Sequence, residues 1–273
     1  MATSPVLVTG GTGTLGRLVV ARLRDAGREV RVLSRRHHDG AEGVEFVTGD
    51  LTTGEGIGPA VAEAGTIVHC AGSPKGDEEK ARNLVRAASR AGAPHLVYIS
   101  VVGADRIPLA SGIDRAMFGY FGAKLAAERA VADSGLPWTT VRATQFHDSF
   151  LMVAQQMARF PVILAPAGFR FQPIDPGEVA TRLAELALGP PAGLVPAMAG
   201  PRVYSMADLV RGYLRACRKH RPILPVRLPG QAARAFRDGA NLAPERAVGR
   251  RTWEEFLAAR VGPNPEPSAM LPA

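Results

Sequence analysis

The 273-residue sequence predicts an α/β protein with a doubly wound parallel sheet. Short apolar runs rich in β-branched residues alternate with segments whose apolar residues recur at helical spacing. The first run, residues 6–8, leads directly into a glycine-rich turn and a helical segment. Because a strand–helix–strand unit of this kind crosses over right-handedly, its repetition predicts parallel strands with helices on both faces of the sheet.

The first part of the chain contains the repeated units. Strands are predicted, from runs of β-favouring apolar residues, at residues 6–8, 29–33, 44–47, 66–69, 95–99 and 137–142. Helices are predicted, from apolar residues three and four positions apart, at residues 15–23, 57–64, 78–91 and 116–134. We therefore expect one large domain over residues 1–160.

The following residues predict a small C-terminal α+β lobe over residues 161–262. Its helices are expected at residues 175–188, 206–217, 231–237 and 252–260, the second of them capped by Ser205, whereas a helix at residues 146–160 is expected at the end of the first domain. Extended segments are expected at residues 169–173, 193–198 and 223–228. Four apolar residues of the lobe are expected to line a pocket or to form a small core, namely Leu224, Val226, Phe236 and Leu242. The proline-rich tail, residues 263–273, is expected to be disordered.

The glycine-rich turn after the first strand is the most informative stretch. Gly11, Gly13 and Gly16 match G-x-G-x-x-G between a predicted strand and a predicted helix. Glycine there permits a tight turn, close approach of a pyrophosphate to the backbone, and packing of the helix on its strand. The amide groups that open the helix would then hold the phosphates. The motif predicts a Rossmann-type dinucleotide site formed by Gly10, Gly11, Thr12, Gly13, Thr14 and Leu15.

Ligands of such sheets bind at the carboxyl ends of the strands, which selects further residues. The second strand is followed by Ser34, Arg35 and Arg36, where an NAD-specific site carries an acidic residue. Two guanidinium groups suit a 2′-phosphate, so NADP(H) is preferred over NAD(H). The alternative is that the arginines form a solvated loop.

Three more strand ends contribute candidates for cofactor binding. Asp50, next to Leu51, either accepts a hydrogen bond from the adenine amino group or caps the turn before Thr52. Small side chains after the fourth strand allow the backbone to pass close to a ribose or phosphate. Cys70 among them is interpreted as a packing residue, because no sequence feature suggests an activated thiolate. The candidates from these two strand ends and from the sixth are Asp50, Leu51, Cys70, Ala71, Gly72, Ala143, Thr144, Gln145 and Phe146.

Tyr120 and Lys124 are the candidate catalytic pair. On the predicted helix they share one face, and a cation beside a phenol favours the phenolate and lowers its pKa. Such a tyrosine can exchange a proton with a substrate oxygen, and a serine hydroxyl can polarise the same oxygen. His147 is either a substrate ligand or proton relay, or a polar residue at a helix start.

The motifs together resemble an atypical short-chain dehydrogenase/reductase of the NmrA-like branch, which binds NAD(P) on a Rossmann fold. The residues that carry the resemblance are the loop 9–16, Gly49 to Leu51, Tyr98 to Ser100, Tyr120 with Lys124, and Arg142 to Phe146. The resemblance covers residues 4–190 and extends toward residue 260. It implies a nicotinamide beside Tyr120 and Lys124. Alignment on Gly103 places Ser100 in the third catalytic position, whereas alignment on the strand end places Val102 there.

Composition limits the partners that we expect. The net charge of +8 comes from scattered basic residues without interleaved aromatics, which argues against nucleic acid. No apolar run approaches the ~20 residues that span a bilayer, and no leader pattern precedes the first strand, so no membrane partner is expected. Cys70 and Cys217 lie in no metal-ligand spacing, which predicts no metal site and a reduced, cytoplasmic protein. The oligomeric state, a homodimer included, stays open.

Three functions are consistent with these observations. The first is an NADP(H)-dependent oxidoreductase that acts on a small carbonyl-type or related organic substrate, with Tyr120 as proton donor and Lys124 as its activator. The second is a non-catalytic NADP(H)-binding redox sensor or regulator, in which this pair anchors the ribose. The third is an epimerase or isomerase that retains its cofactor. The intact Tyr120/Lys124 pair favours the first.

Overall fold

The computed structural model of the chain describes residues 4–40, 43–73 and 76–261. The chain divides into two compact units, each drawn from three separate stretches. The first unit comprises Met1–Ser100, Gly119–Arg142 and Pro176–Pro196, and the second comprises Val101–Phe118, Ala143–Asp175 and Ala197–Ala273. The units therefore interleave along the chain and do not follow a single boundary at residue 160. The prediction for the tail, residues 263–273, lies outside the described residues.

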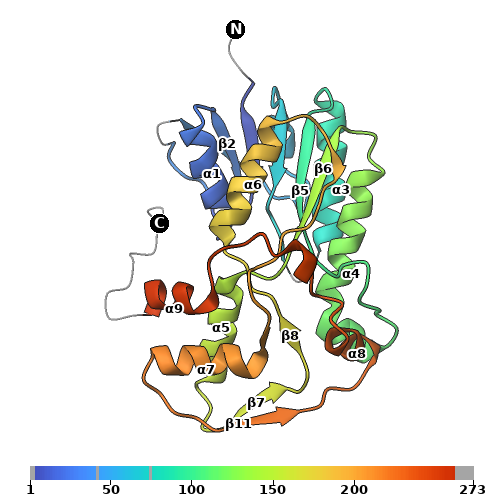
Figure 1. Ribbon diagram of the computed structural model, residues 1–273. Helices are drawn as coiled ribbons and strands as arrows, with labels where there is room; N and C mark the ends of the chain where they lie inside the picture. Colours follow the sequence, from blue (N-terminus) through green and yellow to red (C-terminus); the bar gives the residue numbers. More distant parts are fainter. Residues whose placement is uncertain (1–3, 41–42, 74–75, 262–273) are drawn as a thin grey trace. The chain divides into compact units, whose positions relative to one another are not determined.

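The first unit is built on a seven-stranded sheet with the strand order β3-β2-β1-β4-β5-β6-β9 (Figure 1). Its strands are β1 Val6–Thr9, β2 Val30–Ser34, β3 Val44–Thr48, β4 Thr66–His69, β5 His95–Val101, β6 Trp138–Ala143 and β9 Gly193–Leu194. Val6 of β1 pairs in parallel register with Val30 of β2 on one side and Thr66 of β4 on the other. The predicted parallel Rossmann-type sheet is thereby confirmed.

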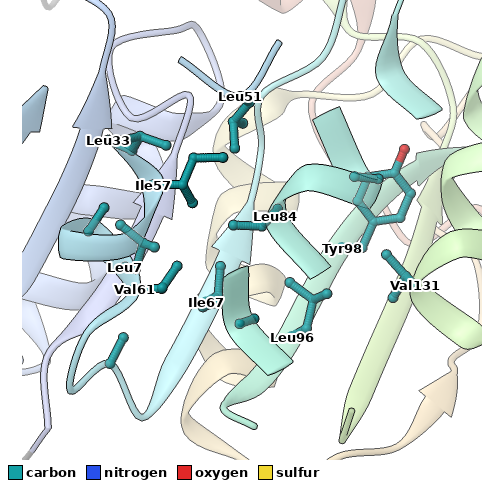
Figure 2. Close-up of a cluster of buried hydrophobic side chains, with 14 of the residues drawn as sticks. Leu7, Leu33, Leu51, Ile57, Val61, Ile67, Leu84, Leu96, Tyr98 and Val131 are labelled. Carbon is teal, nitrogen blue, oxygen red and sulfur yellow. The ribbon is translucent and has the colours of Figure 1, made fainter. Parts of the chain in front are cut away.

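One face of the sheet is covered by α2 Ile57–Val61, α3 Asp77–Arg90 and the part of α4 Gly112–Ala132 that belongs to this unit. Figure 2 shows the apolar cluster that holds these helices on the strands, with Leu7, Leu84, Leu96 and Val131 among its fully buried members. The cluster extends continuously from β2 to the end of α4. Its formation depends on the period-two pattern of the strands, which directs alternate side chains to this face.

The opposite face carries α1 Gly16–Asp25 and α6 Pro176–Leu188, which lie side by side (Figure 1). In β2, Leu33 belongs to the cluster of the first face, so its neighbour Val32 points to the second, where it lies near Gly11 together with Val20 of α1. Arg22 of α1 donates a hydrogen bond to the Thr181 hydroxyl of α6 at 3.1 Å. Helices on both faces confirm the doubly wound arrangement.

The second unit combines helices with two small sheets. Its helices are α5 His147–Met157, α7 Met206–Ala216, α8 Gln231–Arg237, the 3₁₀ turn η1 Pro244–Arg246 and α9 Trp253–Val261. Antiparallel β8 Arg170–Phe171 and β10 Tyr204–Ser205 form one sheet, and parallel β7 Ile163–Pro166 and β11 Ile223–Val226 form the other. Ser205 caps α7 as predicted, in a reciprocal capping box with Asp208.

Two strands of the second unit were not predicted. β7 has four residues and ends in a proline, while β10 has two residues, so neither offers a local pattern long enough to recognise. Phe236 and Leu242 are buried, but Leu224 and Val226 of β11 are exposed, so the expectation that these residues form a small core was wrong for this strand. None of the described helices is long and apolar enough to cross a membrane.

Candidate cofactor site

The glycine-rich loop between β1 and α1 is packed as tightly as its sequence predicts. Gly10 has a φ of +70°, and a Cβ there would lie 2.7 Å from the backbone nitrogen of Ala71, at the end of β4. A Cβ on Gly16 would lie 2.1 Å from the Gly10 carbonyl oxygen, and one on Gly11 would lie 2.7 Å from Val32. These three glycines therefore allow the loop, the helix and two strands to approach one another.

Gly13 differs from the other glycines of the loop. Among the described residues, a Cβ at Gly13 would meet only the Gly10 carbonyl oxygen, at 3.3 Å. The Gly13 N–H donates to that oxygen at 3.0 Å, which closes the turn. Gly13 lines an open cavity, and because glycine has no side chain, a ligand in the cavity can approach the backbone closely.

The start of α1 is electrostatically suited to an anion. Leu15 at the N-cap makes no side-chain capping bond within the described chain, and the first turn contains no acidic residue. By contrast, α3 carries Asp77, Glu78 and Glu79 in its first turn. No carboxylate of its own first turn thus compensates the partial positive charge at the start of α1, which suits the binding of a diphosphate. The glycine loop and this helix start together fit a dinucleotide.

A cavity of about 730 Å³ opens at the carboxyl ends of β1, β2, β3 and β4. It is lined by most of the predicted cofactor residues, namely Gly10, Thr12, Gly13, Ser34, Arg35, Arg36, Asp50, Leu51, Cys70, Ala71 and Gly72. Gly11, Thr14 and Leu15 do not line it, and Gly11 instead packs on β2. The lining also includes residues that sequence analysis missed, among them His38, Thr52 and Lys80.

The two arginines after β2 are exposed at this cavity. The Arg36 backbone N–H donates to the Ser34 hydroxyl at 3.2 Å, which shapes the turn that presents both side chains. Neither guanidinium has a hydrogen bond or an ion pair with any residue in the described ranges. Both side chains are consequently available to an anionic group, although the solvated-loop alternative predicts the same exposure.

Asp50 performs the turn-capping role that sequence analysis left open. Its Oδ1 accepts the Thr52 backbone N–H at 2.7 Å. That bond, assisted by the nearby Arg35 charge, lowers the pKa of the Asp50 carboxyl below its usual value. The Leu51 side chain is buried in the apolar cluster, so only its backbone is available for polar contacts. An adenine contact by Asp50 stays a prediction.

The end of β4 forms the floor of the cavity. Burial raises the pKa of the Cys70 thiol to about 12, so the thiol is protonated at neutral pH and agrees with a packing role. His69, one residue earlier, forms a 2.7 Å hydrogen bond with the Thr9 hydroxyl and stacks on Tyr98. Burial lowers the pKa of His69 to about 3, so this imidazole is neutral.

Lys124 is held in place by a residue that sequence analysis did not single out. Its Nζ lies 3.2 Å from Oδ2 of Asp77, and both side chains are buried. The ammonium also donates to the Ile99 carbonyl oxygen at 3.3 Å. A Cβ on Gly72 would lie 3.1 Å from Nζ, so a side chain at this position of the β4 loop would crowd the ammonium group. Asp77 could have been suspected only from its place in the helix that follows β4.

Asp77 also organises the loop at the cavity. Its Oδ1 accepts the Ser73 backbone N–H at 2.7 Å, and the Ser73 hydroxyl accepts a short hydrogen bond from Lys80. Lys80 Nζ lies 3.9 Å from the same carboxylate. One buried carboxylate therefore faces two ammonium groups. The excess positive charge is appropriate to a cavity for a phosphorylated ligand.

Tyr120 lies next to Lys124, but its pKa is not lowered as predicted. The Lys124 ammonium is 5.9 Å from the centre of the Tyr120 ring. Burial, and secondarily the negative charge of Asp77, raise the pKa of the Tyr120 phenol. The expectation of a depressed pKa was wrong because it considered the cation without the carboxylate that neutralises it and without burial. In this structure the phenol is the neutral, proton-bearing form.

Ser100 is placed on the same side of β5 as Tyr98, since alternate residues of a strand point to one face. It is buried, and its hydroxyl has no hydrogen-bond partner among the described residues. Val102, the alternative third residue, belongs to the second unit, where it packs in an apolar cluster with Ala199 and Ala243. Of the two alternatives, Ser100 alone provides a polar group.

The remaining candidates, Ala143 to Phe146, lie in the second unit. The Thr144 N–H donates to the Met198 carbonyl oxygen, and Phe146 bridges to Ile174. Their role in cofactor binding stays a prediction.

His147 is the first residue of α5, which agrees with the interpretation of His147 as a residue at a helix start. The side chain is fully buried and stacks on Phe256 with ring centres 5.0 Å apart. Burial lowers the pKa of His147 to about 4. The ring is therefore neutral and part of an aromatic core.

Comparison with known proteins agrees with this geometry. A family model described as NAD(P)H-binding matches residues 10–155. A (4-alkanoyl-5-oxo-2,5-dihydrofuran-3-yl)methyl phosphate reductase of Streptomyces griseus is 33% identical over 180 residues, which cover 64% of this chain and 60% of the reductase. A photosystem II assembly factor of Synechocystis is 28% identical over 153 residues, covering 52% of this chain and 44% of that protein. The chain thus spans 60% or less of the length of these two relatives.

A solved structure extends the likeness to almost the whole chain. The NADPH complex of an NADPH-dependent quinone oxidoreductase from Escherichia coli superposes with a TM-score of 0.75. It covers 93% of this chain and 98% of that one at 18% identity. At this level of identity the superposition shows the fold alone.

Proposed function

This chain belongs to the NAD(P)H-binding family, within the NmrA-like type of atypical short-chain dehydrogenase/reductase, and from that premise we propose that it is an NADPH-dependent reductase of a small carbonyl-type organic substrate. The observation that carries the proposal is the glycine cradle beside an uncapped helix start, with exposed Arg35 and Arg36 at the same cavity. A diphosphate fits the former, and a 2′-phosphate fits the latter.

The side chains beside the cavity suggest how the protein would assist the reaction. Bound NADPH would supply a hydride to the carbonyl carbon. Tyr120, protonated because its pKa is raised, would donate its proton to the carbonyl oxygen. The unpartnered Ser100 hydroxyl would donate a hydrogen bond to the same oxygen. Lys124, fixed by Asp77, would hold positive charge beside the phenol as the phenolate forms.

Replacement of Tyr120 tests the catalytic proposal. Tyr120→Phe is expected to reduce the rate of NADPH oxidation about 100- to 10,000-fold, because the proton donor is lost. NADPH affinity should change little, since the ring is retained. The measurement is NADPH absorbance across a panel of ketones, aldehydes, quinones and enones. Tyr204→Phe, at a tyrosine whose hydroxyl donates to Glu254, serves as the control. A Tyr120→Phe variant as fast as the wild type would remove this residue from the mechanism.

Replacement of both arginines tests the cofactor preference. Arg35→Ala with Arg36→Ala is expected to weaken NADPH binding about 10- to 100-fold and NADH binding less than about threefold, because only NADPH carries a 2′-phosphate. Calorimetric titration with each nucleotide measures the difference. Arg86→Ala with Arg90→Ala removes the same charge from the exposed face of α3 and should leave both affinities unchanged. An equal loss for NADPH and NADH would refute the 2′-phosphate role.

A second candidate is a non-catalytic NADP(H)-binding regulator. It is favoured by the Asp77–Lys124 ion pair, which neutralises the cation that would activate Tyr120. One relative is also described as an assembly factor. Tight NADPH binding without turnover of any member of the panel would favour this candidate.

A further inference from the structure

An apolar strip lies on the outer face of the small sheet formed by β7 and β11. Within β7, Ile163 and Ala165 point inward and are buried, whereas Leu164 between them is 61% exposed. Leu164 pairs with Leu224 of β11, which is 51% exposed. Val226 lies two positions after Leu224 in β11 and shares its outward face. The segment that leads into β7 adds the exposed side chains of Phe160 and Val162, and we call these five residues, Phe160, Val162, Leu164, Leu224 and Val226, the strip. Figure 1 shows the two strands side by side.

The two segments that contain the strip carry basic residues but no acidic residues. Residues 149–174, which contain β7, include two arginines, and residues 209–237, which contain β11, include seven arginines and one lysine. Neither segment contains an aspartate or a glutamate. Five exposed cations flank the strip and form no ion pair with any described residue, namely Arg159, Arg218, Lys219, Arg221 and Arg227.

The strand pairing brings these cations to the ends of the strip. Because β7 and β11 are parallel, the segments that enter them lie together, and the Ile163 N–H donates to the Pro222 carbonyl oxygen at 2.9 Å. Arg159, Arg218, Lys219 and Arg221 precede the strands at this end. Arg227 follows β11 at the other end, where the Ala167 N–H bonds the Val226 carbonyl oxygen.

We propose that this strip and its cations dock the protein peripherally on an anionic lipid bilayer. A bilayer interface offers an apolar layer to the leucines, valines and phenylalanine, and anionic headgroups to the flanking cations. A second copy of the chain fits poorly, since it would bring two sets of unpaired cations together. No membrane partner was expected from the sequence because no segment is long enough to span; a peripheral contact requires no such segment.

The test is co-sedimentation of the full chain with vesicles. Wild-type protein should bind vesicles of equal parts phosphatidylglycerol and phosphatidylcholine, and bind pure phosphatidylcholine vesicles weakly. Changing Arg218, Lys219, Arg221 and Arg227 to Gln should reduce the partition coefficient about 100-fold or more. Leu164→Ser with Leu224→Ser should reduce it as well, because the apolar anchor is lost. NADPH affinity and the melting temperature report that each variant is folded.

Control variants elsewhere on the surface, and tests for other binding partners, show whether binding to vesicles is specific to the strip. Arg82→Gln with Arg86→Gln and Arg90→Gln removes exposed charge from α3, and Leu188→Ser removes an exposed leucine from α6; both should bind anionic vesicles like the wild type. No binding to anionic vesicles, or equal binding by the strip variants, would overturn the proposal. Self-association abolished by Leu164→Ser with Leu224→Ser would assign the strip to a second copy instead. Stronger binding to polyglutamate or duplex DNA than to vesicles would also overturn it.

Discussion

Gly10→Ala is expected to weaken NADPH binding about 10- to 100-fold, which corresponds to losing one charge-assisted hydrogen bond to the diphosphate. Gly10 adopts a φ of +70°, and a methyl group there would lie 2.7 Å from the Ala71 nitrogen and 2.8 Å from its Cα. Because the contacted atoms of Ala71 are backbone atoms, they cannot move aside as easily as the end of a flexible side chain can. The loop must therefore move away from β4, and its amides lose their alignment toward the phosphates.

Gly27→Ala is the matched control for Gly10→Ala. Gly27 has a φ of +71°, but a Cβ there would meet no described atom within 4 Å. Alanine is strained in the left-handed region, so Gly27→Ala should lose roughly 1–2 kcal/mol of the free energy of unfolding. Gly10→Ala should lose more, because its methyl group also meets the backbone of Ala71. Calorimetric titration should show wild-type NADPH affinity for Gly27→Ala alone. Wild-type affinity in Gly10→Ala would show that the loop does not grip the diphosphate.

Asp77→Asn is expected to lower the free energy of unfolding by roughly 3–5 kcal/mol, the usual effect of removing one partner of a buried ion pair. Asp77 is 1% exposed and Lys124 is 5% exposed, so the remaining ammonium would be left without its carboxylate and away from water. Asparagine keeps an oxygen that can accept the Ser73 N–H, so the change isolates the charge. Denaturant unfolding, followed by circular dichroism, provides the measurement.

Two comparisons separate the ion pair from other effects of Asp77→Asn. Glu78→Gln removes an exposed carboxylate one residue later, whose bond to Arg82 is largely in solvent, and should cost less than about 1 kcal/mol. Asp77→Leu with Lys124→Met removes both charges and should recover much of the stability lost in Asp77→Asn. A loss in Asp77→Asn no larger than that in Glu78→Gln would contradict the assignment of a buried pair.

The sequence predicted the sheet and the cofactor cradle because both depend on local patterns. Each of the first six strands is a short apolar run, and the predicted boundaries of each strand agree with those in the structure within one or two residues. Gly10, Gly13 and the two arginines were recognised because residues that directly follow a parallel strand, here β1 and β2, lie at the carboxyl edge of the sheet. A motif of this kind needs only neighbouring residues to specify its backbone.

The electrostatic state of the catalytic candidates could not be predicted in the same way. The i, i+4 spacing of Tyr120 and Lys124 placed the two residues on one helical face, and the structure agrees. The spacing could not show that Asp77, 47 positions away in the chain, would pair with Lys124. A pKa depends on every charge and on the burial around a group, so the predicted direction for Tyr120 was reversed.

The sequence by itself determined the doubly wound sheet, the glycine loop and the cationic turn after β2, because periodicity, glycine spacing and charge act between residues close in the chain. Only the tertiary structure decided that β9 adds a seventh strand beside β6, that α6 packs beside α1, and that Asp77 holds Lys124. It also left the apolar residues of β7 and β11 exposed. These features arise from contacts between distant segments, whose burial and electrostatic energies no local pattern encodes.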